Sequence, residues 1–133
     1  IGLKVTHSLE ELYHKSDIIS IHVPAKGEHL KSVGNQVLKG LKEDAIIINT
    51  ARKEVINEGE LLAAMEEKPG IRYLTDVAPD RKAEFLERFK DRFYATPVKI
   101  GAQTNEANNN AGVAAAEQIV AFFQHGDISC QVN

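Results

Sequence analysis

Three polar residues, Arg52, Asp76 and Lys99, each lie at or just beyond the end of a hydrophobic run of the sequence. An arginine is a planar bidentate donor for carboxylates and phosphates, so Arg52 is a candidate clamp for an anionic ligand. The carboxyl ends of parallel strands share one rim of a sheet, and α/β proteins bind ligands there. The sequence therefore predicts that the three side chains converge on one ligand, with a solvated loop charge as the alternative for each.

The elements that would position these residues alternate between strands and helices. Hydrophobic runs at residues 18–23, 45–49, 71–77 and 93–96 are predicted to be strands. The run at 45–49 is rich in isoleucine, which is typical of a strand buried on both faces of a sheet. Strands that alternate with helices over short connections indicate parallel βαβ units, and hence an α/β, doubly wound parallel sheet.

Polar residues mark where the intervening helices are expected to begin. Ser8 and Asn57 are each followed three residues later by a carboxylate, the pattern of a capping box, and Asn35 is expected to cap a brief helix. A further helix is expected at residues 81–90, with three hydrophobic side chains on one side: Phe85, Leu86 and Phe89. Residues 104–124 are rich in Ala and Asn and predict one long helix that stops at Gly126.

The composition excludes several classes of partner. Hydrophobic residues make up 43% and charged residues 26% of the 133 residues, as in an ordinary globular domain. A net charge of −3, without a cluster of basic and aromatic residues, argues against nucleic acid as a partner. No apolar run approaches the roughly 20 residues that span a bilayer, so we expect no membrane partner. The sequence begins with Ile1 rather than Met and is expected to be a fragment of a longer polypeptide.

Histidine and cysteine do not form a recognisable metal site in the sequence. Cys130 is the single cysteine, which fits a reducing cytoplasmic setting. His22 is expected in the middle of a strand as a packed or hydrogen-bonded core residue, because no other His or Cys has metal-ligand spacing to it. Gly101 and Ala102 would allow a ligand to approach the backbone closely, although a loop glycine more often serves a turn. No G-x-G-x-x-G turn is present.

Four motifs together resemble one family. Residues 22–24 (His-Val-Pro), 49–52 (Asn-Thr-Ala-Arg), 76–77 (Asp-Val) and 96–104 occur in the order and approximate spacing of the D-isomer-specific 2-hydroxyacid dehydrogenases. Within that family, the stretch from Lys99 onward is most similar to the short phosphoglycerate dehydrogenases that lack a regulatory domain.

This resemblance implies a fold, a cofactor and an activity. Residues 1–104 would be the C-terminal part of a Rossmann-like NAD-binding domain without its glycine-rich turn, and residues 105–133 a long helix and tail that return toward a substrate domain. The implied enzyme is cytoplasmic, pairs as a homodimer through the NAD-binding domain, and acts on a small 2-hydroxy acid. Its implied reaction is the NAD-dependent oxidation of D-3-phosphoglycerate, the entry step of serine synthesis.

The resemblance also implies a role for individual residues. Arg52 matches the arginine that holds the substrate carboxylate and carbonyl, and Asp76 matches the acid that accepts a hydrogen bond from the nicotinamide carboxamide. Arg52 and Asp76 are expected to line the NAD site together with further residues: His22, Val23, Pro24, Thr50, Ala51, Lys99, Gly101 and Ala102.

Two positions depart from the family pattern. The family has a catalytic histidine directly after its Thr-Pro pair, whereas here Val98 follows and then Lys99, as in one subgroup of phosphoglycerate dehydrogenases. The acid that would orient Lys99 is expected to be Asp80, with Glu84 as the alternative. A lysine with its ordinary pKa of about 10.4 cannot accept a proton at neutral pH, so Lys99 would need a depressed pKa for oxidation but none for the reverse reduction.

Two alternative functions also fit the sequence. The same fold would serve a glyoxylate or hydroxypyruvate reductase, because substrate choice lies largely in the other domain. The alternative outside the class of enzymes is a non-catalytic binding protein that responds to NAD(H).

Overall fold

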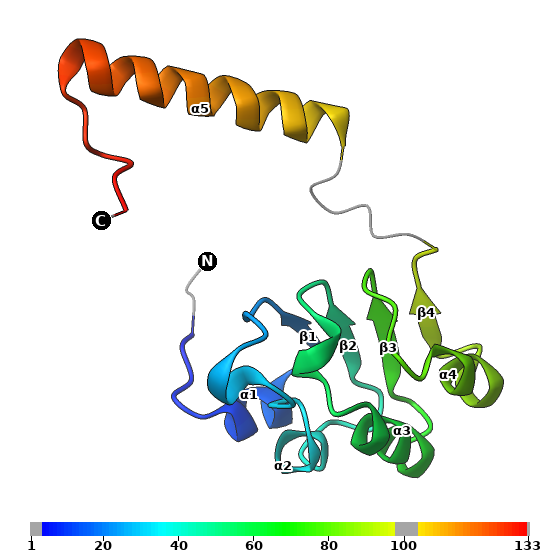
Figure 1. Cartoon of the computed structure of the whole chain (residues 1–133). Helices are drawn as coiled ribbons and strands as arrows, with labels where there is room; N and C mark the ends of the chain where they lie inside the picture. Colours follow the sequence, from blue (N-terminus) through cyan, green and yellow to red (C-terminus); the bar gives the residue numbers. More distant parts are fainter. Residues whose placement is uncertain (1–3, 98–103, 133) are drawn as a thin grey trace. The chain divides into compact units, whose positions relative to one another are not determined.

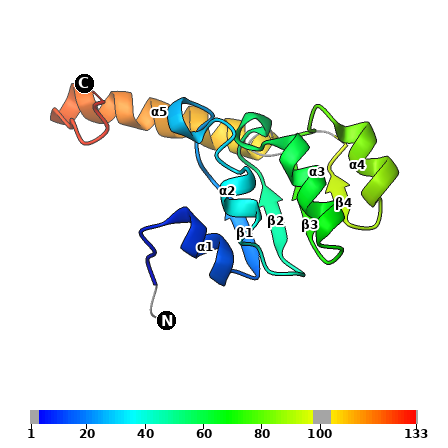
Figure 2. The same cartoon turned by 90° about the horizontal axis from the view of Figure 1, so that it is seen from below.

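The computed structural model describes residues 4–97 and 104–132, which divide into two compact units between Lys99 and Ile100. The first unit holds a four-stranded parallel sheet in the order β1-β2-β3-β4 (Figure 1, Figure 2). The strands are β1 (Ile18–Ile21), β2 (Ile46–Asn49), β3 (Arg72–Thr75) and β4 (Phe93–Ala95). Each strand lies within a predicted run, so the predicted alternation is confirmed with shorter strands.

Helix α1 (Leu9–Lys15) precedes β1, and three α-helices and two 3₁₀ turns connect the strands. The connecting elements are η1 (Gly27–His29), α2 (Asn35–Leu38), η2 (Lys53–Val55), α3 (Glu58–Glu67) and α4 (Lys82–Phe89). Two predicted caps are confirmed, because Ser8 Oγ accepts from the Glu11 amide at 3.3 Å and Asn57 Oδ1 accepts from the Glu60 amide at 3.4 Å.

The start of α2 differs from the prediction. Its cap is Gly34, which has no side chain to offer, and not Asn35. The carboxylate of Glu60, from the first turn of α3, accepts a hydrogen bond from the Asn35 amide at 2.6 Å instead. A donor at the end of a helix was therefore satisfied by a residue distant in the sequence.

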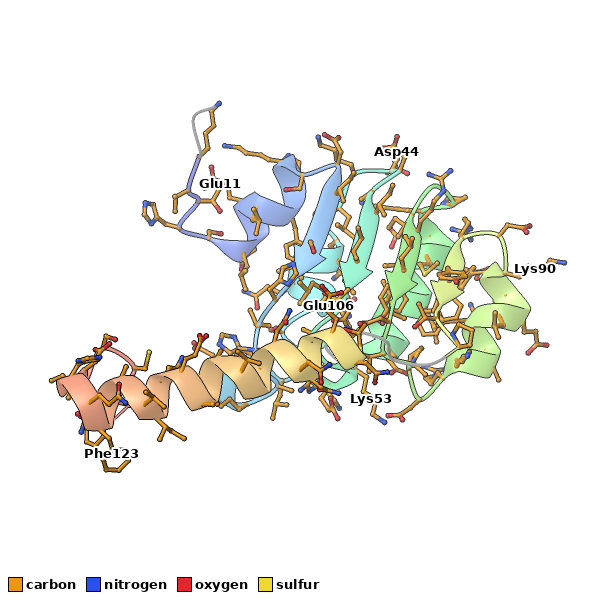
Figure 3. The ribbon with its side chains drawn as sticks, turned by 90° about the horizontal axis from the view of Figure 1, so that it is seen from above. Glu11, Asp44, Lys53, Lys90, Glu106 and Phe123 are labelled. Atoms are coloured by element: carbon orange, nitrogen blue, oxygen red, sulfur yellow. The ribbon has the colours of Figure 1, made fainter. Side chains whose placement is uncertain are left out.

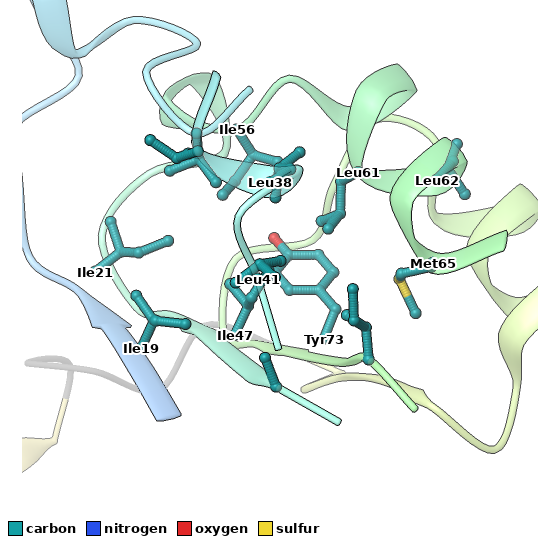
Figure 4. Close-up of a cluster of buried hydrophobic side chains, with 14 of the residues drawn as sticks. Ile19, Ile21, Leu38, Leu41, Ile47, Ile56, Leu61, Leu62, Met65 and Tyr73 are labelled. Atoms are coloured by element: carbon teal, nitrogen blue, oxygen red, sulfur yellow. The ribbon is translucent and has the colours of Figure 1, made fainter. Parts of the chain in front are cut away.

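One face of the sheet carries the hydrophobic core. Helices α1 to α4 all contribute to the same buried cluster as the inward-facing strand residues, several of which Figure 4 shows. These strand residues are Ile19, Ile21, Ile47, Tyr73 and Phe93. Beside them, the Phe85 ring stacks on Phe93 with centroids 4.9 Å apart.

The opposite face of the sheet is less covered than the sequence suggested. Ile46 and Ile48 are half-buried rather than buried, so the prediction that residues 45–49 are buried on both faces is wrong within the described part of the first unit. Ile18 and Tyr94, on the outer strands, are each 59% exposed. Helix α4 also differs, because Leu86 is 45% exposed while its neighbours Phe85 and Phe89 face the core.

The second unit holds the long helix α5 (Asn105–His125). Thr104 Oγ1 accepts from the Ala107 amide at 3.0 Å to cap its start, and Gly126 ends it in the left-handed conformation with φ 64°. The predicted helix and its glycine stop are confirmed. Its apolar side chains are exposed within the unit, among them Val113, Ile119 and Phe123. No helix of the described residues is long and apolar enough to cross a membrane.

Candidate functional site

All four strands end in one row. Ile21, Asn49, Thr75 and Ala95 are aligned across the sheet by its register, so the chain leaves every strand at the same edge. Figure 3 shows the two ends of β2 through its labelled neighbours, with Asp44 at the amino end and Lys53 at the carboxyl end. Arg52 and Asp76 follow adjacent strands at this carboxyl rim. Their convergence on one ligand remains a prediction, and Lys99, Gly101 and Ala102 lie outside the described residues.

A hollow of about 630 Å³ lies beside the ends of β1 and β2. It is lined by His22, Val23, Pro24, Ala25, Thr50, Ala51 and Arg52. All of these except Ala25 were predicted to line a cofactor site. The hollow is lined by both polar and apolar groups, a combination found in ligand sites.

Arg52 is exposed at the edge of this hollow. Its Nη1 donates to the carbonyl of Ala51 at 2.8 Å, which folds the guanidinium back over its own loop. Within the described part of the chain no carboxylate lies within ion-pair distance of Arg52. The charge is therefore available to an anionic group.

Asp76 presents an unsatisfied acceptor. The side chain is half-buried, and its Oδ1 is buried without a hydrogen-bond partner among the described residues. A buried polar atom left without a partner costs about 1–3 kcal/mol. Such an atom is suited to accept a hydrogen bond from a ligand, for example from an amide N–H.

Asp80 and Glu84, the two acids considered as partners of Lys99, both pair with other cations. Asp80 Oδ1 lies 2.5 Å from Lys53 Nζ, and this hydrogen bond and charge raise the pKa of Lys53. Glu84 pairs with Arg81 at 2.6 Å and Arg88 at 3.0 Å. Desolvation raises the pKa of Glu84, but the two arginines together outweigh it and lower the pKa.

His22 does not occupy the predicted core position. It lies just beyond β1, is exposed, and its Nε2 is 2.7 Å from Ser20 Oγ. The predicted core position in the middle of a strand is wrong, because β1 ends at Ile21 and the hydrogen-bonded ring of His22 is exposed. The described residues contain no group of three or more potential ligands that could hold a metal ion.

Two buried polar residues of the rim were missed by sequence reasoning. Asn49 is 0% exposed and Thr75 is 4% exposed, and both hydrogen-bond to the backbone of the loops that carry Arg52 and Asp76. Burial raises the pKa of the neighbouring Tyr73, and hydrogen bonding to Asn49 and Thr75 partly opposes this rise. The signal in the sequence that could have identified Asn49 and Thr75 is a polar residue at the end of a hydrophobic run.

A parallel sheet with helices and a hollow at its carboxyl rim is a Rossmann-like α/β arrangement. Residues 2–97 match the model of the D-isomer specific 2-hydroxyacid dehydrogenase, NAD binding domain, and the chain therefore belongs to this family. The predicted family and fold class are thereby confirmed.

Individual relatives agree with this assignment. The chain is similar to the crystal structure of an NAD⁺-bound 3-phosphoglycerate dehydrogenase from Entamoeba histolytica, with 46% identity, a TM-score of 0.81, and coverage of 96% of this chain and 42% of that one. It is 32% identical to a D-3-phosphoglycerate dehydrogenase from Haemophilus influenzae over 98% of this chain and 33% of the relative. It is 33% identical to a glyoxylate reductase from Thermococcus litoralis over 85% of this chain and 34% of the relative. The chain thus spans about a third of the length of these curated relatives.

Proposed function

We propose that this chain is the C-terminal part of the NAD-binding domain of a longer 2-hydroxyacid dehydrogenase. Residues 1–104 belong to that domain, and residues 105–133 return toward the substrate domain. The observation that carries the proposal is that an available cation, Arg52, and a buried acceptor without a partner, Asp76 Oδ1, follow the ends of adjacent strands. The length of the curated relatives, about three times that of this chain, supports the assignment to part of a longer dehydrogenase.

The residues of the rim fit NAD. Val23 and Pro24 offer an apolar surface for the adenine, and Thr50 and Ala51 lie beside the nicotinamide ribose. Asp76 Oδ1 accepts a hydrogen bond from the carboxamide, which gives this buried atom the partner that it lacks among the described residues. When bound, NAD supplies a hydride acceptor in one direction and a hydride donor in the other.

The substrate is held by charge and by hydrogen bonds. Arg52 binds the carboxylate of a 2-hydroxy acid with its bidentate fork and orients the C2 hydroxyl. Lys99 takes the hydroxyl proton on its Nζ during oxidation and returns it during reduction. Asp80 orients Lys99, with Glu84 as the alternative, and its second carboxylate oxygen is the one that we assign to this task because Oδ1 pairs with Lys53. The enzyme pairs as a homodimer through the cofactor domain.

D-3-phosphoglycerate is the substrate that we favour. The support is the 46% identity to the phosphoglycerate dehydrogenase of Entamoeba histolytica, together with the lysine in place of histidine. The similarity to a glyoxylate reductase makes glyoxylate or hydroxypyruvate reduction the second candidate. Both candidates share the same rim residues and differ in the chemistry of the substrate side chain.

A substrate panel with the whole dehydrogenase tests this proposal. NADH absorbance is followed with D-3-phosphoglycerate, glyoxylate and hydroxypyruvate, and we expect D-3-phosphoglycerate to be oxidised with the highest kcat/KM. Preference for glyoxylate would favour the second candidate. NADH binding without turnover of any of them would indicate the non-catalytic binding protein.

The role of Lys99 needs a variant and a matched control. Lys99→Met should abolish turnover while NADH binding, measured by fluorescence, stays within threefold of the parent. Lys90→Met removes an exposed lysine at the end of α4 and should leave both unchanged. Turnover of Lys99→Met within a few-fold of the parent would contradict the assignment.

A further inference from the structure

Asn49 and Thr75 connect the loops that carry Arg52 and Asp76 through their buried side chains and the backbone carbonyl of Asn49. The Asn49 amide bridges forward along its own loop, since Oδ1 accepts from the Ala51 amide at 3.0 Å and Nδ2 donates to the Arg52 carbonyl at 3.0 Å. The backbone carbonyl of Asn49 faces the next strand and accepts a hydrogen bond from the Thr75 hydroxyl at 2.8 Å. Asn49 therefore contacts both loops.

Thr75 repeats this arrangement one strand further on. Its Oγ1 accepts from the Val77 amide at 3.0 Å, so it spans Asp76 in the way that Asn49 spans the residues before Arg52. The Asp76 backbone is held from both sides, because its amide donates to the Asn49 carbonyl at 3.4 Å and its carbonyl accepts from Thr96 Oγ1 at 3.3 Å. The Thr96 amide in turn donates to the Thr75 carbonyl at 3.0 Å.

We propose that Asn49 and Thr75 are positioning residues, in which Asn49 sets the place of Arg52 for the substrate and Thr75 sets the place of Asp76 for the cofactor. The inference rests on the proposed function. Both residues are buried, Asn49 at 0% and Thr75 at 4% exposure, so we assign them to holding the loops and not to direct contact with a ligand.

The residue type at position 49 follows from the two hydrogen bonds. An asparagine supplies an NH₂ donor and a C=O acceptor from the same planar group, whereas an ionised aspartate supplies acceptors alone and an aliphatic residue supplies neither. A buried amide costs free energy unless both ends are paired, and here both are paired with backbone groups of the Arg52 loop. An apolar residue would fill the same space in the core at lower cost, but it would leave the Ala51 amide and the Arg52 carbonyl without these partners.

A double-mutant cycle in the whole dehydrogenase separates positioning from general stability. Asn49→Ala should lower kcat/KM for the hydroxy acid by about tenfold or more and weaken NADH binding by a smaller factor, because Thr50 and Ala51 of the same loop border the cofactor. Arg52→Lys should lower kcat/KM by about a hundredfold, because a point charge replaces the bidentate fork. If Asn49 acts through Arg52, the double variant should be no worse than Arg52→Lys alone.

Some results of this cycle would overturn the role of Asn49. Losses that multiply in the double variant would show that Asn49 acts independently of Arg52. A folded Asn49→Ala protein with parental kcat/KM would show that Asn49 does not position Arg52. If Asn49→Ala does not fold, Asn49→Ser is used in its place, since a serine hydroxyl supports the same turn more weakly.

The role of Thr75 is tested by cofactor binding, with a conservative variant as control. Thr75→Val keeps the shape but removes the hydroxyl, and should raise the NADH dissociation constant about tenfold. Thr75→Ser keeps the hydroxyl and should restore the constant to within threefold of the parent. Equal affinities for Thr75→Val and the parent would overturn the proposal for Thr75.

The binding arm also distinguishes this inference from the proposed function. A parent that binds NADH without turning over any hydroxy acid contradicts the dehydrogenase assignment, while the two Thr75 variants still decide the positioning of Asp76. A parent that fails to bind NADH overturns both.

Discussion

Replacing Asp76 by alanine should weaken cofactor binding without weakening the folded protein. The Oδ1 atom is buried without a hydrogen-bond partner among the described residues. Leaving such an atom unpaired costs about 1–3 kcal/mol, so its removal relieves a cost in the absence of NADH. With NADH bound, the same atom makes a charge-assisted hydrogen bond worth about 1.5–3 kcal/mol, which corresponds to roughly a 10- to 150-fold change in the dissociation constant.

Thermal melts of the whole dehydrogenase, with and without NADH, measure both effects. The melting temperature of Asp76→Ala without NADH should equal or exceed that of the parent, and the rise that NADH produces should be smaller than in the parent. Asp44→Ala, an exposed aspartate at the opposite end of β2 (Figure 3), serves as the matched control and should change neither quantity. A variant at position 76 that melts well below this control would refute the reasoning, because it would mean that the buried oxygen already has a stabilising partner.

Three further predictions concern the scaffold. Gly70→Ala would place its Cβ against the backbone of the segment leading into β2 and should cost about 1–3 kcal/mol in a denaturant melt, whereas Gly40→Ala meets only ordinary contacts and should change little. Phe85→Ala should cost about 3–5 kcal/mol because the ring is fully buried, while Leu86→Ala, 45% exposed, should cost much less in the same assay. Burial raises the pKa of Tyr13 to about 12, so its contribution to stability is complete below about pH 10 and is lost as the pH rises through about 12, which tyrosinate absorbance and melts at each pH will follow.

Local patterns were enough to predict the class of fold. The alternation of hydrophobic runs with capped helices requires only neighbouring residues, and Ser8, Asn57 and Gly126 act as the sequence indicates. The partner of the α2 N-terminus was not predictable in this way, because Glu60 lies 25 residues from Asn35. The incomplete burial of the second face of the sheet was also not predictable, since an isoleucine-rich run does not indicate what packs against it.

The candidate site shows the same limit. Arg52 and Asp76 were recognisable because they carry charge at the ends of strands, and the register places them at one rim. Asn49 and Thr75 were missed because their importance depends on hydrogen bonds to backbone groups across strands. The pairing of Asp80 with Lys53 likewise depends on two loops that meet only in the folded chain.

The common row at which the strands end suggests where this scaffold can be re-engineered. Loops grafted from relatives can be joined immediately after this row, because Ile19, Ile47, Tyr73 and Phe93 of the core lie before it and Ile21 is the core isoleucine within it. Asn49 and Thr75 belong to the row itself, yet their side chains reach forward to hold the loops. A graft that keeps these two residues retains the hydrogen bonds that hold the new loops in place. A graft that replaces them loses those hydrogen bonds.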